Sequence, residues 1–584
     1  DREPSQQLGL PTTMILEDGG PLLAAYPKGH GKVAIACGLT WPERLPAPVT
    51  RAASQATPPI PRVLDLEGEE RLVLSPRQSP IRMASSGDDG RTWAPLGTIS
   101  DVGGLASIVG VPFTRAGLDA QANPRPEDDA EPPIARSASP SSPGRPRLVV
   151  LTDISSLSAG EAEPDDGQSL IRLMLYSNEF DIEGLVASSN LGHGRRVRPE
   201  LIRRVVDSYE QVRPNLLLHD DRYPPAQDLR SCIKAGQPVA GPDVPVAECV
   251  GVGKDTEASD WIIQVVDRAD PRPVWGIVWG GSADLAQALW KVRWERSPEE
   301  VGRFLAKLRV HSIGDQDATG PWIRQEFPDL FTIVQQRAYR GMYRGGDATL
   351  VSSAWVKENI HGHGPLGDLY PDYDGGDIWS STLGRVRGIK EGDTPSFLSL
   401  VPNGLSDEGR PQLGGWGGRF EGEARRLSDV ADLDLDGSGD PDPRMSSVYR
   451  WRPAFQADFA ARLAWCVQPR GQANHPPVVR IAGDGERTVR PGDTVELDAS
   501  ESTDPDGDGL DFSWSVYPTT PEFLDKVVIE GRDASTARLV VAPELVGRTI
   551  PIVVAVTDRG RPRLTRYGRV VLTVRGGGGR PEAK

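Results

Sequence analysis

The chain has 584 residues, which is too long for a single hydrophobic core, so three or four domains are expected. Its 82 acidic and 66 basic side chains give a formal net charge of −16. This charge argues against nucleic acid or an anionic membrane as the main partner and favours cations and neutral polar ligands. No apolar run approaches the ~18 residues of a transmembrane helix, so no membrane span is expected.

The cysteine pattern does not indicate a metal site. Four cysteines occur, at Cys37, Cys232, Cys249 and Cys466, and none has metal-ligand spacing. Cys232 and Cys249 are either a disulfide or free buried thiols. The chain begins "DREPSQQ" without a signal peptide, so an exported protein would have lost its leader before the numbering begins.

Residues 1–115 contain short β segments separated by glycine and proline. "SGDDGRTW" (Ser86 to Trp93) fits the Asp-box pattern Ser-x-Asp-x-Gly-x-Thr-Trp and resembles the repeats of sialidases and other propellers, in which the box is structural. A propeller blade needs roughly 40–45 residues, so this region cannot close a ring. We interpret it as a sialidase-like, β-propeller-like fragment. Residues 116–146, rich in Pro, Ser and Ala, are predicted to be a disordered linker.

Strand-like and helix-like segments alternate over residues 147–470. "RLVVLTD" precedes helical "GQSLIRLMLYSN", "IEGLVASS" precedes helical "PELIRRVVDSYEQV", and "PVWGIVWGG" precedes helical "ADLAQALWKV". A further strand is expected at "NLLLH". This alternation predicts an α/β domain with a mainly parallel sheet flanked by helices.

The chain becomes all-β over residues 471–575, with alternating segments such as "TVELDAS", "LDFSWSVY" and "IPIVVAVTD". They predict a β-sandwich, followed by a flexible tail at 576–584. "LDASESTDPDGDGLDFSW" resembles the immunoglobulin-like repeats of extracellular bacterial enzymes, which implies a secreted or periplasmic protein. Its acidic loop, and "DLDLDGSGDPD" (Asp432 to Asp442), are each either a Ca²⁺ loop or a solvated turn.

Carboxylates gather where the first α/β strand meets the next helix. Asp153 follows the strand "LVVLT", Asp165 and Asp166 begin the helix, and Glu161 and Glu163 lie between them. One Asp would suffice to cap the helix. Three aspartates at one strand end exceed that role and supply the oxygen ligands that Ca²⁺ prefers. We favour a metal site over a cap.

This stretch resembles the nucleoside hydrolases, which have a strand ending in Asp-x-Asp and an Asp-Asp pair at the helix start. It is more similar to the nucleoside-hydrolase-like domain of certain cellulose-binding proteins from polysaccharide-degrading bacteria. The matching segments are Thr152-Asp153, Pro164-Asp165-Asp166, Gln168-Ser169, "LMLYSNEFDIEGLVA", "PRPVWGIVWGGSADLAQAL", "GDQDATGPWIRQEFPDLF" and "EGDTPSFLSL".

The resemblance implies a role for each matched residue. Asp153 would bind Ca²⁺ and take the proton of a metal-bound water, and Asp166 would be a bidentate ligand. Asp165 would belong to the same metal cluster and face a sugar hydroxyl. A backbone carbonyl at or near Ala283 and the carboxylate of Asp393 would complete the metal shell. Taken alone, Asp393 is a turn residue before a helix.

The chain departs from nucleoside hydrolases in three ways. The first acid of the Asp-x-Asp is missing, the loop between Ile154 and Glu163 is longer, and Gly392 stands where many members have a His for the leaving base. The half of the site that activates water is therefore retained, and the leaving group is a base or a sugar. We expect Glu161 or Glu163 to serve as the general acid for a hydroxyl-bearing leaving group.

Three further polar residues follow strands or lie in loops and are candidates for substrate contacts: Asn190, Asp317 and His363. Asn190 has a structural alternative that we favour, and His363 is equally a loop residue. Trp275 and Trp279 are expected in the core. A third tryptophan, at position 416 in "GGWGGRF", is either an exposed sugar platform or part of the core.

We therefore expect an exported, Ca²⁺-dependent hydrolase of N- or O-glycosidic bonds. Its partner would be a carbohydrate or a nucleoside-like small molecule. The alternative is a non-catalytic carbohydrate-binding protein on the same scaffold, with cellulose as the ligand. The oligomeric state is not predicted.

Overall fold

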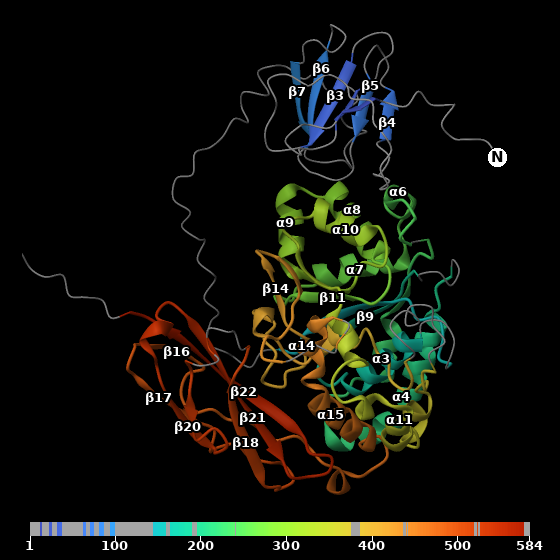
Figure 1. Cartoon of the computed structure of the whole chain (residues 1–584). Coiled ribbons are helices and arrows are strands. Elements are labelled where there is room, and N and C mark those ends of the chain that lie inside the picture. Colours follow the sequence, from blue (N-terminus) through green and yellow to red (C-terminus); the bar gives the residue numbers. More distant parts are fainter. Residues whose placement is uncertain are drawn as a thin grey trace, which may run out of the picture. The chain divides into compact units, whose positions relative to one another are not determined.

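The structure is a computed structural model (Figure 1). It describes residues 144–158, 164–189, 196–239, 241–374, 386–435, 440, 442–518, 523 and 526–576, together with the backbone of seven strands nearer the N-terminus. The chain forms two compact units, Asp1–Ser139 and Pro140–Lys584.

The first unit contains a five-stranded sheet in the order β1-β2-β3-β6-β7 and a separate β4–β5 pair, all antiparallel. The strands are β1 (Thr12–Met14), β2 (Leu23–Ala25), β3 (Lys32–Cys37), β4 (Arg62–Asp65), β5 (Arg71–Leu74), β6 (Ile81–Ser86) and β7 (Ala94–Ile99). The Asp-box residues between β6 and β7, and the expected linker as far as residue 143, lie outside the described residues. The propeller-like interpretation therefore stays a prediction.

The second unit is built on an eight-stranded sheet in the order β10-β9-β8-β11-β12-β13-β15-β14. All neighbours are parallel except β14 and β15. The strands are β8 (Arg147–Thr152), β9 (Asp181–Ala187), β10 (Ile233–Ala235), β11 (Val274–Val278), β12 (Leu308–Ile313), β13 (Phe331–Gln335), β14 (Phe420–Glu423) and β15 (Arg426–Asp429). This arrangement confirms the predicted mainly parallel sheet.

Helices cover both faces of this sheet (Figure 1). The α-helices are α3 (Pro164–Leu175), α4 (Pro199–His219), α5 (Ala226–Ser231), α6 (Val246–Cys249), α7 (Glu257–Asp267), α8 (Ala283–Glu295), α9 (Pro298–Lys307), α10 (Thr319–Glu326), α11 (Ser353–Asn359), α12 (Gly364–Asp368), α13 (Pro395–Leu398), α14 (Ser446–Tyr449) and α15 (Arg452–Ala464). Short 3-10 turns include η2 (Ala338–Met342).

The apolar run of β8 is explained by burial on both faces. Leu148 and Val150 pack into the core formed with α3, α4 and α15. Val149 and Leu151 alternate with them and pack into a second core formed with α7, α8 and α9. A strand covered by helices on both sides cannot expose a polar face, so the side chains between the polar ends of β8, from Leu148 to Leu151, are all apolar.

The expected strand at "NLLLH" is wrong, because these residues form the last turns of α4. The buried residues Val212, Leu216 and His219 recur at helical spacing on one face. Pro214 lies inside the helix at an exposed position, and it lacks the N–H that would donate to the carbonyl four residues earlier. Helical periodicity over the whole segment outweighed the local run of leucines.

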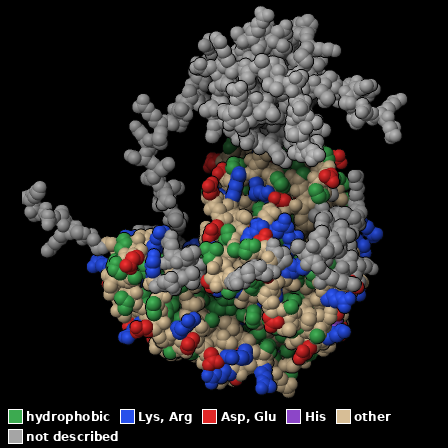
Figure 2. All heavy atoms as spheres, viewed as in Figure 1, with side chains coloured by type: hydrophobic (Ala, Val, Ile, Leu, Met, Phe, Trp, Pro, Cys, Tyr) green, Lys and Arg blue, Asp and Glu red, His purple; other side chains and the backbone are tan. Residues whose placement is uncertain are grey.

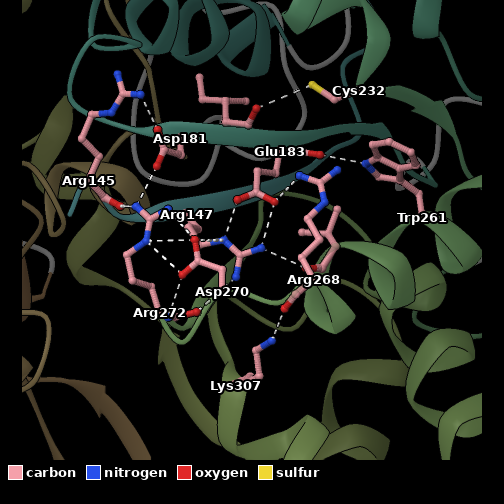
Figure 3. A network of polar contacts seen from close by, with 12 residues as sticks. Arg145, Arg147, Asp181, Glu183, Cys232, Trp261, Arg268, Asp270, Arg272 and Lys307 are labelled. Atoms are coloured by element: carbon pink, nitrogen blue, oxygen red, sulfur yellow. Dashed lines mark hydrogen bonds and ion pairs between the residues drawn. The ribbon is translucent and has the colours of Figure 1, made fainter. Parts of the chain in front are cut away.

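Ion pairs connect neighbouring strands at the end of the sheet where the parallel strands begin (Figure 3). The Arg147 guanidinium is fully buried at the start of β8 and donates to Glu183 of β9 at 2.5 Å and 2.9 Å. Arg272 donates to Asp181 at 2.7 Å and to Asp270 at 2.6 Å. At this edge each of the named acids therefore has an arginine partner.

The C-terminal part forms the predicted β-sandwich. Its two sheets have the orders β16-β22-β21-β18 and β17-β20-β19. The strands are β16 (Glu486–Val489), β17 (Thr494–Asp498), β18 (Leu510–Val516), β19 (Ile529–Glu530), β20 (Thr536–Val540), β21 (Thr549–Asp558) and β22 (Thr565–Val574). Trp514, Leu539 and Ile552 belong to its buried core.

The sandwich packs closely on the α/β domain. Gly404 has φ of +86°, and a Cβ at this position would lie 1.8 Å from the Tyr567 carbonyl oxygen, so only glycine fits. Trp416 is fully buried here and donates from its indole nitrogen to the Tyr567 hydroxyl at 3.2 Å. Trp416 therefore belongs to the core and is not an exposed sugar platform. Trp275 and Trp279 are also fully buried, as expected.

The three cysteines in the described part, Cys232, Cys249 and Cys466, are free buried thiols. Cys232 and Cys249 are therefore free thiols and do not form a disulfide. No helix in the described ranges is long and apolar enough to cross a membrane.

Candidate functional site

The acidic residues meet at the carboxyl end of β8. Asp153 directly follows this strand and is 2% exposed. Asp165 and Asp166 lie in the first turn of α3 and are also buried. The end of β11 closes the pocket on another side, because a Cβ added to Gly280 would lie 2.4 Å from Cγ of Asp153. Glycine at this position therefore leaves room for the carboxylate.

The loop that carries Asp393 lies against the same acids. Lys390 donates from its ammonium to Oδ2 of Asp165 at 3.1 Å, and both side chains are buried. A Cβ added to Gly392 would lie 3.4 Å from the same oxygen. Asp393 is itself 4% exposed. Lys390 and Gly392 thus lie against Asp165 although more than two hundred positions separate them from it in the chain. The convergence of the Asp393 carboxylate with Asp153 and Asp166 stays a prediction.

Gln168 of α3 ties this loop to the helix that carries the acids. Its amide oxygen accepts from the backbone N–H of Lys390 at 2.8 Å and of Glu391 at 3.1 Å. Its amide nitrogen donates to the carbonyls of Pro371 at 2.7 Å and Gly388 at 2.9 Å. One fully buried side chain therefore satisfies four backbone groups.

The loop adopts a strained conformation at Glu391, a non-glycine residue with φ of +34°. The Glu391 carboxylate is fully buried, pairs with Arg172 of α3 at 2.6 Å, and accepts from the Tyr370 hydroxyl. Thr394 donates to Ser169 of α3 at 3.1 Å. These contacts fix the backbone on both sides of Asp393.

Two donors reach the acids from within the chain. The Thr152 hydroxyl donates to Oδ1 of Asp166, and Lys390 pairs with Asp165. Lys390 was not recognised in the sequence, although it is the basic residue beside "EGDTP". Sequence patterns gave no reason to choose it, because its proximity to Asp165 depends on the turn at Glu391.

Two observations disagree about calcium. The donor chemistry fits, since carboxylate oxygens are the ligands that Ca²⁺ prefers, and the buried Oδ1 of Asp165 has no hydrogen-bond partner in the described part of the chain. Within those same ranges, however, no three Asp, Glu, His or Cys side chains are arranged to hold a metal ion. We give the donor chemistry more weight, because side chains commonly change rotamer on binding. Calcium would require such a change.

The neighbouring strand ends are joined by Asp317. This residue follows β12, and its carboxylate accepts from the backbone N–H of Ser282 at 2.9 Å and of Thr319 at 2.8 Å. Burial raises the pKa of Asp317. Ser282 precedes Ala283, the expected carbonyl ligand, which is fully buried at the start of α8. Asp317 thus fixes the turn before α8, and its contact with substrate stays a prediction.

Asp284, which the sequence reasoning missed, is a second buried acid in this turn. Burial raises its pKa to about 6. Its carboxylate accepts from the Thr256 hydroxyl at 2.6 Å and the backbone N–H of Gln237 at 3.1 Å. Its position after Ser282 in "GGSADL" is that of a first-turn acid, which is the only signal that the sequence carries.

For four of the expected site residues, the structure gives no contact with the acids. Glu161, Glu163 and Asn190 lie outside the described residues. His363 precedes α12, and its ring nitrogen Nδ1 lies 3.2 Å from the carbonyl oxygen of His361. The adjacent Gly364 faces Val212 of α4 and a valine at position 467. None of these contacts is with the acids, so the role of His363 stays a prediction.

The two other acidic loops have protein partners. Asp432 pairs with Arg419 at 3.1 Å and with Arg450 at 2.8 Å, so arginines satisfy a residue of the "DLDLDGSGDPD" loop. In the sandwich, Asp504 accepts from backbone N–H groups of its own turn, as at Asp508 at 3.0 Å. The choice between a Ca²⁺ loop and a turn stays open for both loops.

The comparisons with known proteins agree with this fold. The profile of the family described as "Cellulose-binding Sde182, nucleoside hydrolase-like domain" matches residues 147–420. The profile described as "Cellulose-binding protein Sde0182, C-terminal domain" matches residues 494–574. No curated protein matches the chain.

Among solved structures, the chain is similar to a nucleoside hydrolase-related hypothetical protein from Saccharophagus degradans that is associated with carbohydrate metabolism. The two are 32% identical, with a TM-score of 0.61, over 74% of this chain and 100% of the other. A PKD domain from the KIAA 1837 protein is 23% identical over 18% of this chain and 92% of the other, with a TM-score of 0.15. The long match to the first structure and the two profiles place this chain in the family of cellulose-binding proteins with a nucleoside hydrolase-like domain.

Proposed function

We propose that the pocket around Asp153 binds a sugar-containing molecule and hydrolyses its glycosyl bond, and that the protein is exported to act on polysaccharide-derived material. The observations that support this proposal are the burial of Asp153, Asp165 and Asp166 at one strand end and the contact of Lys390 and Gly392, which precede the buried Asp393, with Asp165. Ligands bind at this edge of open α/β sheets. The family description supports a carbohydrate as the substrate class.

In this proposal Asp153 is the base that takes a proton from the attacking water. It directly follows β8, and the carboxylate occupies the space that the missing side chain of Gly280 leaves open. Calcium is the proposed cofactor, held by Asp153, Asp166 and Asp393. When bound, it would supply an oriented water of lowered pKa. Asp165 would accept from a sugar hydroxyl.

The leaving group is expected to be a sugar or another hydroxyl-bearing group. Gly392 supplies no acid, and the space beside it is filled by the ring of Tyr339, 3.4 Å from an added Cβ. Burial raises the pKa of Tyr339. We assign the general acid to Glu161 or Glu163. Glu163→Gln should then slow substrates with poor leaving groups more than activated aryl glycosides.

A second candidate function is carbohydrate binding without catalysis. The observation that favours it is the ammonium of Lys390, which already pairs with Asp165. In that case the acids would accept hydrogen bonds from sugar hydroxyls, and no bond would be cleaved. The family description fits this alternative equally well.

Release of reducing sugar separates the two functions. The wild type is incubated with nucleosides and with oligosaccharides, with added Ca²⁺ or with chelator. We expect release with oligosaccharides and loss of release in Asp153→Asn. Asp315→Asn is the matched control, because Asp315 ends a neighbouring strand but pairs with Arg324 at 2.7 Å. If the folded wild type binds oligosaccharides yet releases nothing under any condition, the binding-only function replaces hydrolysis.

A further inference from the structure

A second concave site lies between the α/β domain and the sandwich. Its volume of about 660 Å³ is within the ~300–1,000 Å³ range of ligand sites, which occur preferentially at domain interfaces. Its walls are the start of α15 on one side and the outer face of β18, β21 and β22 on the other. The hollow between these two parts, with hydrophobic side chains inside it, is visible in Figure 2. None of its lining residues belongs to the acidic pocket.

The sandwich wall carries short polar groups in a regular row. Asp511 of β18 pairs with Thr557 of β21, which pairs with Thr565 of β22, so the three side chains lie in line across the sheet. Ser513 lies two residues along β18 and shares this face. The alternate residues, such as Trp514, point into the sandwich core. This wall therefore presents hydroxyl and carboxylate groups to the groove.

The opposite wall is apolar and nearly flat. It is formed by Pro453, Ala454 and Ala457 on one side of α15, with Trp451 at the start of the helix. Trp451 is held by edge-to-face contacts with Tyr517 at 4.9 Å and Tyr567 at 5.4 Å between ring centroids. Small side chains leave the width of the groove open, while the fixed indole closes one end.

The charged groups that line the groove are compensated within the protein. Asp511 pairs with Arg563 at 2.5 Å and with Arg559 at 2.6 Å. Arg450 pairs with acids outside the groove, including Asp434 at 2.9 Å. A charged ligand would have to break one of these pairs, whereas a neutral polar ligand would not. The charge distribution therefore selects a neutral ligand.

The groove is also preformed, because the two domains are locked together beside it. Asp458 of α15 is buried and pairs with Arg566 of β22 at 2.7 Å and with Arg462 at 2.8 Å. The backbone N–H of Tyr567 donates to the Asn403 carbonyl at 2.9 Å. A rigid groove loses little conformational entropy when it binds a ligand.

We propose that this groove binds a neutral oligosaccharide chain, separately from the acidic pocket. The hydroxyl groups of the sugar would bond to Ser513, Thr557 and Asp511, and its C–H faces would pack on the apolar wall of α15. The choice of a carbohydrate rests on the proposed function, since a polymer-acting protein gains from a second point of attachment. The location of the proposed site rests only on the volume and lining of the groove.

Calorimetric titration of the full chain with cellohexaose, xylohexaose and maltohexaose tests the proposal. Ala454→Trp should fill the groove and weaken binding of the preferred hexaose by about tenfold or more. The matched control is Val540→Trp, which adds the same indole to a residue that is 57% exposed on the other sheet of the sandwich. It should leave binding unchanged.

A second, smaller change tests the groove even if Ala454→Trp does not fold. Thr557→Val keeps the side-chain shape and removes one hydroxyl, so binding should weaken about fivefold, the effect of one hydrogen bond. Asp153→Asn should stop hydrolysis and leave this binding intact. The proposal is overturned if the wild type binds none of the three sugars, or if both groove variants bind the preferred hexaose with the affinity and stoichiometry of the wild type. Groove-dependent binding without hydrolysis would instead refute only the proposed function.

Discussion

At the scale of single residues, Lys390 is the most informative feature of the pocket. A lysine with a nearly buried ammonium is stable only beside a carboxylate, and Asp165 supplies it at 3.1 Å. Lys390 is therefore a positive partner of the crowded acids within the described part of the chain. The positive charge of Lys390 beside Asp165 would repel a calcium ion bound to the neighbouring acids, so removal of Lys390 should strengthen calcium binding.

Lys390→Met should destabilise the chelated protein and strengthen the response to calcium. Removing one partner of a buried ion pair costs about 3–5 kcal/mol. Calcium should restore part of that loss, so the melting temperature should rise more on calcium addition than in the wild type. Thermal unfolding with EDTA and with Ca²⁺ measures both effects. Lys291→Met is the control, because its pairs with Asp255 and Asp260 lie at the surface. No response to calcium in any of the three proteins would remove the calcium claim.

His311 gives a prediction about pH. Its ring is fully buried in β12, beside Gln335 at 3.2 Å, and burial lowers its pKa to about 4. The unfolded chain takes up this proton near pH 6.5, so stability should fall as the pH drops from about 6.5 to about 4. The loss attributable to His311 is about 3 kcal/mol at most. Urea unfolding of His311→Gln across this range should show a flatter dependence, and an unchanged slope would contradict the assignment.

At the scale of elements, α3 and the loop that carries Asp393 behave as one unit. Gln168 bonds four backbone groups around residues 371 and 388–391, and Arg172 pairs with Glu391. The strained backbone at Glu391 persists because these contacts hold it. The position of Asp393 therefore depends on side chains of α3 that do not touch substrate.

Gln168→Leu should displace this loop and impair the pocket. It leaves buried N–H and C=O groups without partners, at a cost of about 1–3 kcal/mol for each group. We expect a clearly lower unfolding midpoint and loss of both hydrolysis and the calcium response. The matched control is Ser169→Ala, one residue along, which removes a single contact with Thr394. Equal effects of the two variants would show that Gln168 is not the main support.

At the scale of the whole molecule, the large sheet has different charge patterns at the two ends of its strands. Arginine–carboxylate pairs such as Arg147–Glu183 close the edge where the strands begin (Figure 3). Acids with a lysine and a threonine as internal donors line the edge where the strands end. Compensated charges stabilise the fold, and the end with the acids is the one at which we propose that a ligand binds. The sandwich is fastened to this domain through α15.

Asp458 should couple the sandwich to the α/β domain. Burial acts to raise its pKa, but the charges of Arg566 and Arg462 lower it well below the usual value. Asp458→Asn should therefore cost about 3–5 kcal/mol, because the partly buried Arg566 and the buried Arg462 each lose a carboxylate partner, although Arg462 keeps Glu179 at 2.7 Å. Denaturant unfolding, followed by tryptophan fluorescence, should show a lower midpoint or two separate transitions. Asp511→Asn, which removes a surface partner of two exposed arginines, should cost less than about 1 kcal/mol.

The sequence by itself determined the α/β domain, the β-sandwich and the position of three acids at one strand end. Apolar runs buried on both faces and strict alternation are local patterns, and Asp153, Asp165 and Asp166 lie at a strand end that such patterns identify. The predicted strand at "NLLLH" was wrong, because this local run of leucines belongs to the long helix α4.

Only the tertiary structure decided which distant groups meet. Lys390 reaches Asp165 because Glu391 takes a left-handed turn held by α3, and no local pattern encodes that contact. The burial of Trp416 and the groove beside Trp451 likewise depend on how the sandwich packs on α15. Hydrophobic periodicity is set by neighbours along the chain, whereas buried polar contacts are set by whichever segments the fold brings together.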